Sequence, residues 1–124
     1  GRALLVDPCS DPRKVLAAAD LYVQPSRTEA LSVAIGEALA CGLPVVATSV
    51  GGNPEIVLHE QTGLLVPPAD PPAMAAAIER LVSDESLCDR LGRSGRRFAA
   101  ANLSQDAMLE SYRLVYEGLA GRLS

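Results

Sequence analysis

Aromatic residues are scarce in this 124-residue chain, which has one Phe, three Tyr and no Trp. A core built from such a chain must be aliphatic, and the 48% hydrophobic content can supply it. The scarcity also removes the aromatic platforms on which single-stranded nucleic acids stack. A net charge of −4 argues against general nucleic-acid binding, because phosphate contacts need a basic surface. We therefore expect no nucleic-acid partner.

Cysteine and histidine are few as well. Cys9, Cys41 and Cys88 are an odd number at wide, irregular spacing, so they form neither a CxxC pair nor a disulfide framework, and a cytoplasmic location is expected. Cys41 falls at an apolar helix end, where we expect a small core residue rather than a nucleophile. The single histidine, His59, leaves no histidine-rich metal cluster and is expected to be exposed in a turn.

Long apolar runs are also missing. None approaches the roughly 18 residues of a membrane span, and no signal-peptide pattern opens the chain. The length leaves room for one domain, which can bury about two thirds of the surface of its unfolded chain. Because the first residue is Gly1 rather than Met, we expect the chain to be a piece of a longer protein.

Short apolar runs alternate along the chain with helical patterns. The expected strands are 3–6, 21–23, 45–47 and 63–66, and the expected helices are 12–19, 31–40, a short helix from 53, 70–82, 85–100 and 104–119. Gly42 ends the helix at 31–40, and Asn53 and Asp70 are natural N-caps that precede prolines. This alternation predicts an α/β fold, in which a Rossmann-like parallel sheet has helices on both faces and the last helices close the chain. Ligands bind such a sheet at the carboxyl ends of its strands.

The segment 25–37 is the most informative about function. Glu29 precedes the helix at 31–40, and Glu37 lies inside that helix, eight positions later. At about 1.5 Å per residue this separation is about 12 Å, which is of the order of the length of a nucleotide-sugar. Between the two carboxylates lie the free N–H groups of a helix N-terminus, which favour a phosphate. One segment could therefore hold a sugar, a diphosphate and a ribose in sequence.

Several motifs occur in the order found in a known family. They are Pro-Ser-Arg at 25–27, Glu29 and Glu37, Ala-Leu-Ala-Cys-Gly-Leu-Pro-Val-Val-Ala-Thr at 38–48, Gly-Gly-Asn-Pro-Glu-Ile-Val at 51–57 and Thr-Gly-Leu-Leu-Val-Pro at 62–67. The spacing of two glutamates is a weak signal, whereas the ordered set is a strong one. Over residues 14 to 117 the chain resembles the donor-binding part of retaining glycosyltransferases with the GT-B fold, in the group 1 class (family 4).

The resemblance implies a role for each residue of this segment. Glu29 matches the glutamate at the donor sugar, which accepts hydrogen bonds from sugar hydroxyls and stabilises positive charge at the anomeric carbon. Glu37 matches the glutamate that holds the two ribose hydroxyls. Ala30, Leu31 and Ser32 would offer backbone N–H groups, and Ser32 its hydroxyl, to the diphosphate or the sugar. The family usually has Gly at the position of Ala30.

The resemblance also implies how the chain would work. Residues 1–124 would be a single partial domain, the C-terminal donor-binding half of a GT-B enzyme, and would be inactive alone. With the missing N-terminal domain, which would bind the acceptor, it would transfer a sugar from an NDP-sugar to an acceptor hydroxyl with retention of configuration. Arg27 either helps to neutralise phosphate or is a solvated loop residue. No cofactor or metal is expected, since the chain has no Asp-x-Asp motif.

Two other functions stay open. The chain could be a non-catalytic nucleotide-binding or interaction module, or a part of another GT-B-like enzyme such as a UDP-sugar epimerase. The epimerases and inverting transferases lack the combined signature. Transfer assays on the complete protein would separate these alternatives.

Four arginines recur at near-helical spacing and predict one basic face: Arg90, Arg93, Arg96 and Arg97. This face is either solvated, since acidic residues lie nearby in the sequence, or a contact for anionic lipid or an acidic partner. Peripheral association with the inner face of a membrane is therefore one alternative.

Overall fold

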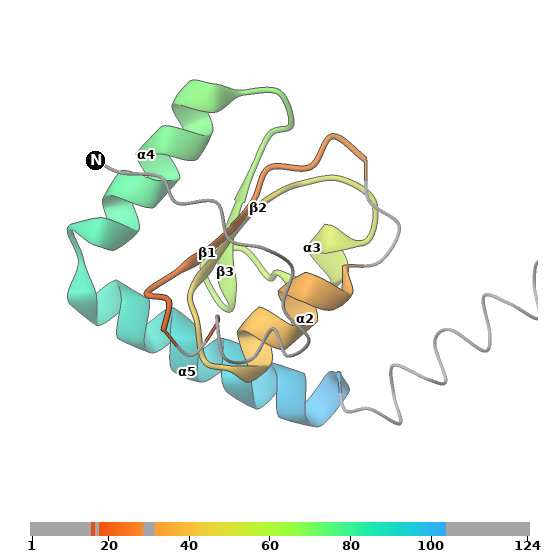
Figure 1. Cartoon of the computed structure of the whole chain (residues 1–124), viewed down its shortest axis with the longest axis vertical. Helices are drawn as coiled ribbons and strands as arrows, with labels where there is room; N and C mark the ends of the chain where they lie inside the picture. The colour runs from red at the N-terminus through yellow and green to blue at the C-terminus, as the bar shows by residue number, and fades with distance from the viewer. Residues whose placement is uncertain (1–15, 17, 29–31, 104–124) are drawn as a thin grey trace, which may run out of the picture.

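The computed structural model describes residues 16, 18–28 and 32–103. The predicted strand at 3–6, most of the predicted helix at 12–19 and the predicted helix at 104–119 lie outside the described residues. Within them, one parallel sheet has the order β1-β2-β3, formed by β1 (Tyr22–Gln24), β2 (Val45–Thr48) and β3 (Gly63–Val66) (Figure 1). The three strands predicted for this part of the chain are confirmed, with limits that differ only at the ends.

Helices follow each strand of the described part: α2 (Val33–Ala40), α3 (Asn53–Ile56), α4 (Pro71–Val82) and α5 (Glu85–Asn102). The side chains of Ser32, Asp70 and Asp84 cap α2, α4 and α5, since each accepts a hydrogen bond from the backbone N–H three residues on. Gly42 follows α2 with a φ of +77°, a left-handed conformation that glycine adopts without strain. No helix among the described residues is both long and apolar enough to cross a bilayer.

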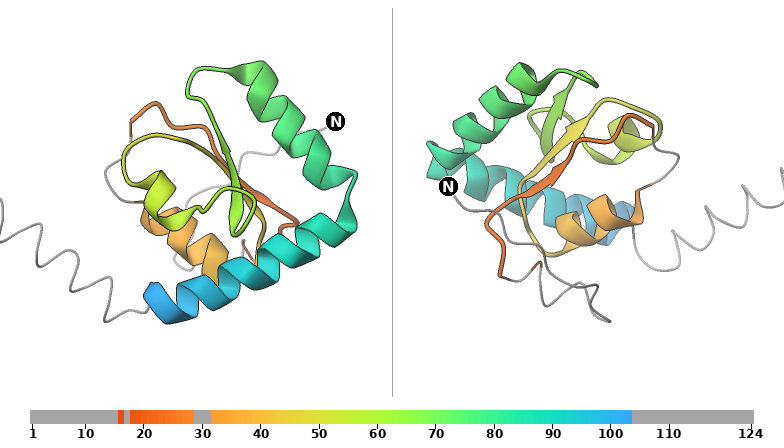
Figure 2. Two further views of the ribbon diagram at one scale, coloured as in Figure 1. Left: turned by 180° about the vertical axis from the view of Figure 1, so that it is seen from behind. Right: turned by 45° about the horizontal axis from the view of Figure 1, so that its top comes forward.

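Two apolar clusters show that helices cover both faces of the sheet. On one face, α2, α3 and the C-terminal part of α5 pack on Val45 and Ala47. On the other face, α4 and the N-terminal part of α5 pack on Val46, Leu64 and Val66. Figure 2 shows α5 passing the sheet from the side of α4 to the side of α2. The predicted Rossmann-like arrangement, with helices on both faces, is confirmed.

Two glycines let α5 lie against the segments that lead into the strands. A Cβ atom at Gly92 would collide with the carbonyl oxygen of Gly42, shortly before β2. A Cβ atom at Gly95 would lie 2.9 Å from Leu39 Cδ2 and 3.4 Å from the carbonyl oxygen of Thr62, just before β3. Helix α5 therefore crosses the edge of the sheet at which β2 and β3 begin.

The turn before β3 is fixed by side chains of α4 and α5. Glu60 has a φ of +67°, and its carboxylate binds the Arg80 guanidinium through both oxygens, with Arg80 Nη2 2.8 Å from Glu60 Oε2. These hydrogen bonds hold the pKa of Glu60 below its ordinary value. Arg90 donates to the main-chain oxygen of Glu60 at 2.9 Å. His59 is exposed, as predicted, and its Nδ1 accepts a hydrogen bond from the N–H of Leu65.

Two predictions about single residues are wrong. Cys41 is exposed rather than buried, because it is the C-cap of α2 and lies beyond the face of that helix that packs on the sheet. Asn53 is not the N-cap of α3, which is preceded by Gly52 instead. The amide of Asn53 donates to the carbonyl oxygen of Thr48, so this side chain fixes the end of β2 rather than the start of the helix.

Replacing Gly92 with Ala should lower the free energy of unfolding by about 1–3 kcal/mol, because the added methyl group pushes α5 away from the segment before β2. The loss should occur although Ala is the better helix former. Urea unfolding measures it, and Ser94→Ala in the same helix is the matched control, with an expected change within about 0.5 kcal/mol. A Gly92→Ala variant as stable as the parent would contradict this close approach.

Candidate functional site

The carboxyl ends of the three strands lie together at the edge of the sheet opposite to α5. A cavity of about 390 Å³ is present there, beside α4. It is lined by residues that follow β1 and β3, by the last residue of β2 and by the first turns of α4: Pro25, Arg27, Thr48, Pro67, Ala69, Asp70, Pro71, Met74, Ala75 and Ile78. Most of this lining is apolar, and Arg27 brings a positive charge to it.

A chain of hydrogen bonds fixes the N-terminus of α2 at the same edge. The hydroxyl of Tyr22 donates to Gln24 Oε1 (2.7 Å), which orients the amide so that Gln24 Nε2 donates to Ser32 Oγ (2.9 Å). Ser32 Oγ also accepts a hydrogen bond from the N–H of Ile35 (3.1 Å). Because this oxygen accepts two hydrogen bonds, the hydroxyl hydrogen is left to donate to a further group. Ser32 is therefore set as a hydrogen-bond donor at the start of α2.

Thr48 connects the loops that follow β1 and β2. Its hydroxyl donates to the carbonyl oxygen of Ser26 at 2.6 Å, and its own carbonyl oxygen accepts from Asn53 Nδ2 at 2.9 Å. Thr48 and Asn53 are both buried. Among the described residues, Asn53 Oδ1 is the buried side-chain atom without a hydrogen-bond partner. These bonds hold the two loops in a fixed relation beside the cavity.

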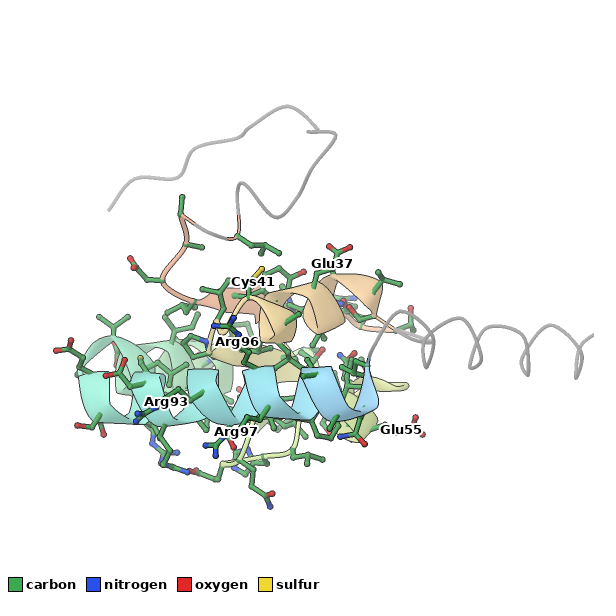
Figure 3. The ribbon with its side chains drawn as sticks, turned by 90° about the horizontal axis from the view of Figure 1, so that it is seen from below. Glu37, Cys41, Glu55, Arg93, Arg96 and Arg97 are labelled. Carbon is green, nitrogen blue, oxygen red and sulfur yellow. The ribbon has the colours of Figure 1, made fainter. Side chains whose placement is uncertain are left out.

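The predicted site residues that the structure describes fall in three places. Arg27 is exposed and lines the cavity, whereas Ser32 is buried at the N-cap of α2. Glu37 is half-buried, about 7.5 Å further along the axis of α2, and points away from α5 (Figure 3). Neither Ser32 nor Glu37 lines the cavity. The other predicted site residues lie outside the described residues: Glu29, Ala30 and Leu31.

The sequence did not reveal how Tyr22, Gln24, Thr48 and Asn53 act at this edge. One signal was available for two of them, since Gln24 and Thr48 are the polar last residues of otherwise largely apolar strands. Such a residue stands where the strand meets the carboxyl edge of the sheet. It is therefore placed to orient the segment that follows.

Among the described residues, the groups with displaced pKa values lie away from this edge. Burial raises the pKa of Cys88, which belongs to α5, and the hydrogen bonds with Glu60 raise the pKa of Arg80 above its ordinary value. In the described part of the chain, no three His, Cys, Asp or Glu side chains are grouped as a metal ion would require.

Comparison with known proteins identifies the family. The family model described as glycosyl transferases group 1 matches residues 2–84. The chain is 30% identical over 115 residues to the N-acetyl-alpha-D-glucosaminyl L-malate synthase of Bacillus anthracis, and 37% identical over 99 residues to the D-inositol 3-phosphate glycosyltransferase of Jonesia denitrificans. The alignments cover 93% and 80% of this chain but 30% and 23% of those relatives. The chain belongs to the group 1 glycosyltransferases and spans less than a third of the length of these relatives.

Solved structures share its fold. The sucrose-phosphate synthase of Thermosynechococcus elongatus has a TM-score of 0.74 and 38% identity, over 87% of this chain and 27% of that chain. The C-terminal domain of the group 1 protein LpcC from Francisella tularensis also has a TM-score of 0.74, at 24% identity. The alignment covers 83% of this chain and 53% of that chain. Anabaena Alr3699/HepE in complex with UDP-glucose has a TM-score of 0.71 and 27% identity. The alignment covers 87% of this chain and 29% of that chain. The predicted resemblance to the C-terminal domain of GT-B enzymes is confirmed.

Ser32→Ala should lower the free energy of unfolding by about 1 kcal/mol, because α2 loses its cap and the amide N–H of Gln24 loses the acceptor that Ser32 provides. Gln24→Met should then destabilise the Ser32→Ala variant less than it destabilises the parent. A double-mutant cycle in urea unfolding measures this coupling. Ser49→Ala, an exposed change at the same edge, is the control and should leave stability unchanged. Strictly additive effects of the two substitutions would contradict the coupling.

Proposed function

We propose that this chain is the donor-binding part of a retaining glycosyltransferase, which moves a sugar from an NDP-sugar to an acceptor hydroxyl. The observation that carries the proposal is the start of α2, where Ser32 is set as a hydrogen-bond donor between Glu29 and Glu37 of the family signature. Membership of the group 1 glycosyltransferases supports it, and so does the similarity to a protein solved with UDP-glucose.

The diphosphate is the leaving group of such a transfer, so its negative charge must be stabilised as the bond to the sugar breaks. The N–H groups of Val33 and Ala34 lie in the first turn of α2, where a helix has no preceding carbonyl groups to accept from them. Together with the hydroxyl of Ser32, they form a set of donors that suits a phosphate. The helix dipole adds partial positive charge, and Arg27 adds a full positive charge at the same edge.

The two glutamates would hold the two ends of the donor. In this proposal Glu29 accepts hydrogen bonds from the sugar and stabilises positive charge at the anomeric carbon. The N–H groups of Ala30 and Leu31 would donate to the diphosphate or the sugar. Glu37 accepts two hydrogen bonds from the vicinal ribose hydroxyls, which a carboxylate with two oxygens is able to do. The mechanism we propose uses these groups and no metal ion or cofactor.

We propose that residues 1–124 are a single partial domain and that the acceptor binds to an N-terminal domain outside this chain. The short share of each relative that the chain covers supports this division. On this basis the chain alone binds the donor and transfers no sugar. A cytoplasmic location fits the three irregularly spaced cysteines.

In the complete enzyme, Glu37→Ala should weaken the binding of free UDP or GDP by about 1.5–3 kcal/mol, because a charge-assisted contact to the ribose is lost. The nucleotide-sugar should lose as much affinity, since it has the same ribose. Isothermal titration calorimetry measures both. Glu79→Ala removes an exposed carboxylate from α4 and is the matched control, with no expected change. Unchanged nucleotide affinity in a folded Glu37→Ala variant would exclude the ribose role.

Glu29→Gln should lower the turnover of the complete enzyme at saturating donor on the order of 100-fold, because it removes the charge that stabilises the transition state. Nucleotide affinity should change little, since size and most hydrogen bonding are kept. Transfer assays and nucleotide titrations on the same variant separate the two effects. Lost affinity with normal turnover would contradict the role given to Glu29, and a parent protein that binds nucleotide without any transfer would favour the non-catalytic alternative.

A further inference from the structure

A strongly basic surface lies on α5, at the edge of the sheet opposite to the candidate donor site. We call it the α5 basic face. It consists of four exposed arginines and one alanine, which line an open groove of about 590 Å³: Arg90, Arg93, Arg96, Arg97 and Ala100. The whole chain has a net charge of −4, so this face is a local concentration of charge of the other sign.

No ion pair ties up the charge of this face among the described residues, although the Glu60 carboxylate lies close enough to Arg90 to interact with it. Arg90 and Arg93 donate to the main-chain carbonyl oxygens of Glu60, at 2.9 Å, and Asp89, at 3.3 Å. Bonds to neutral carbonyl groups orient these side chains without cancelling their charge. The nearby carboxylate of Glu60 is already bound by Arg80. Among the described residues, no carboxylate forms an ion pair with an arginine of the α5 basic face.

The arginines are spread along α5 rather than directed at one point. In Figure 3, Arg93 and Arg97 extend from the same side of the helix, whereas Arg96 extends toward Cys41 of α2. The Cδ atom of Arg96 would lie 3.8 Å from a Cβ atom placed on Gly42, so its aliphatic part covers that turn. Arg93 and Arg97 are about 6 Å apart along the axis. This spread suits several separate anionic groups better than one phosphate ion.

The face also lacks the apolar centre of a protein interface. The large hydrophobic side chains exposed in the described residues are Val33 of α2 and Val82 of α4, and neither lines the groove. Specific protein interfaces usually bury aromatic or aliphatic anchors at their centre. Attraction to the α5 basic face is therefore mainly electrostatic, which is the attraction that a layer of lipid phosphates offers.

We propose that the α5 basic face docks this protein on an anionic phospholipid bilayer. The carboxyl ends of the strands lie at the opposite edge of the sheet, so the docked protein keeps Arg27 and the start of α2 open to a ligand from solution. Each arginine close to such a surface raises the partition coefficient about fivefold, and salt weakens the attraction. Docking needs no bound donor, so it goes beyond the proposed function and does not depend on it.

Co-sedimentation of the complete protein with vesicles tests this docking. The parent should bind vesicles of phosphatidylcholine mixed with phosphatidylglycerol, should not bind vesicles of phosphatidylcholine alone, and should be released by added NaCl. The variant Arg93→Gln/Arg97→Gln should have a partition coefficient about 25-fold lower, since two charges are lost. The single variant Arg97→Gln should lose about fivefold.

Two further variants control for charge and for folding. Arg93→Lys/Arg97→Lys keeps both charges and should bind within about twofold of the parent. Arg27→Gln removes one charge from the opposite edge of the sheet and should bind the vesicles like the parent. Nucleotide affinity should not change in any of the α5 variants, so failure of docking is distinguishable from failure of the proposed function.

Three results would overturn the proposal. The parent could bind neither kind of vesicle, or the two glutamine substitutions could leave binding to anionic vesicles unchanged. In the third case an acidic peptide such as poly-glutamate would bind the α5 basic face while the vesicles did not, and this surface would then belong to an acidic protein partner.

Discussion

The close passage of α5 across the amino ends of β2 and β3 is the constraint on which the described structure depends. It is possible because Gly92 and Gly95 have no side chain where the helix meets the segments before the strands. At this distance one helix reaches both apolar clusters, with Leu87 and Leu91 on the face of α4 and Ala99 on the face of α2. A single helix therefore packs against both apolar clusters. A bulkier residue at either glycine would push α5 away from the sheet and loosen the packing of both clusters.

This closure divides the sheet into two unlike edges. At the amino edge, backbone and side chains of α5 fill the space, and the arginine side chains of α5 lie exposed along it. At the carboxyl edge, the segments after the strands are fixed mainly by single polar side chains, of which Gln24, Ser32 and Thr48 are the described examples. Packing thus stabilises one edge, whereas the other edge carries the candidate donor site, so contacts made at one edge leave the other accessible.

The sheet and the helices of the described part could be predicted, because their signals are local. Strand runs, the Asp70 cap and the left-handed turn at Gly42 depend on a few neighbouring residues. The exposure of Cys41 could not be predicted in this way. Its sequence neighbours are apolar, but the side chain of a residue at the end of a helix can point toward the core or toward solvent. The angle at which α2 packs on the sheet and on α5 then decides whether the side chain is covered.

The sequence predicts a candidate site at the carboxyl ends of the strands, but it does not indicate how the polar atoms there are used. A serine at the start of a helix is commonly a cap, and the sequence indicates no more than that. The bond from Gln24 to Ser32 joins residues eight positions apart, and it requires that the chain turn back from β1 to α2. Through that bond the oxygen of Ser32 accepts a second hydrogen bond, so its hydrogen is left to donate elsewhere. One atom therefore stabilises α2 and orients a donor at its start. Substitution of Ser32 removes both effects together, whereas substitution of Gln24 leaves the cap in place and removes the bond that orients the hydroxyl, together with the acceptor of Tyr22.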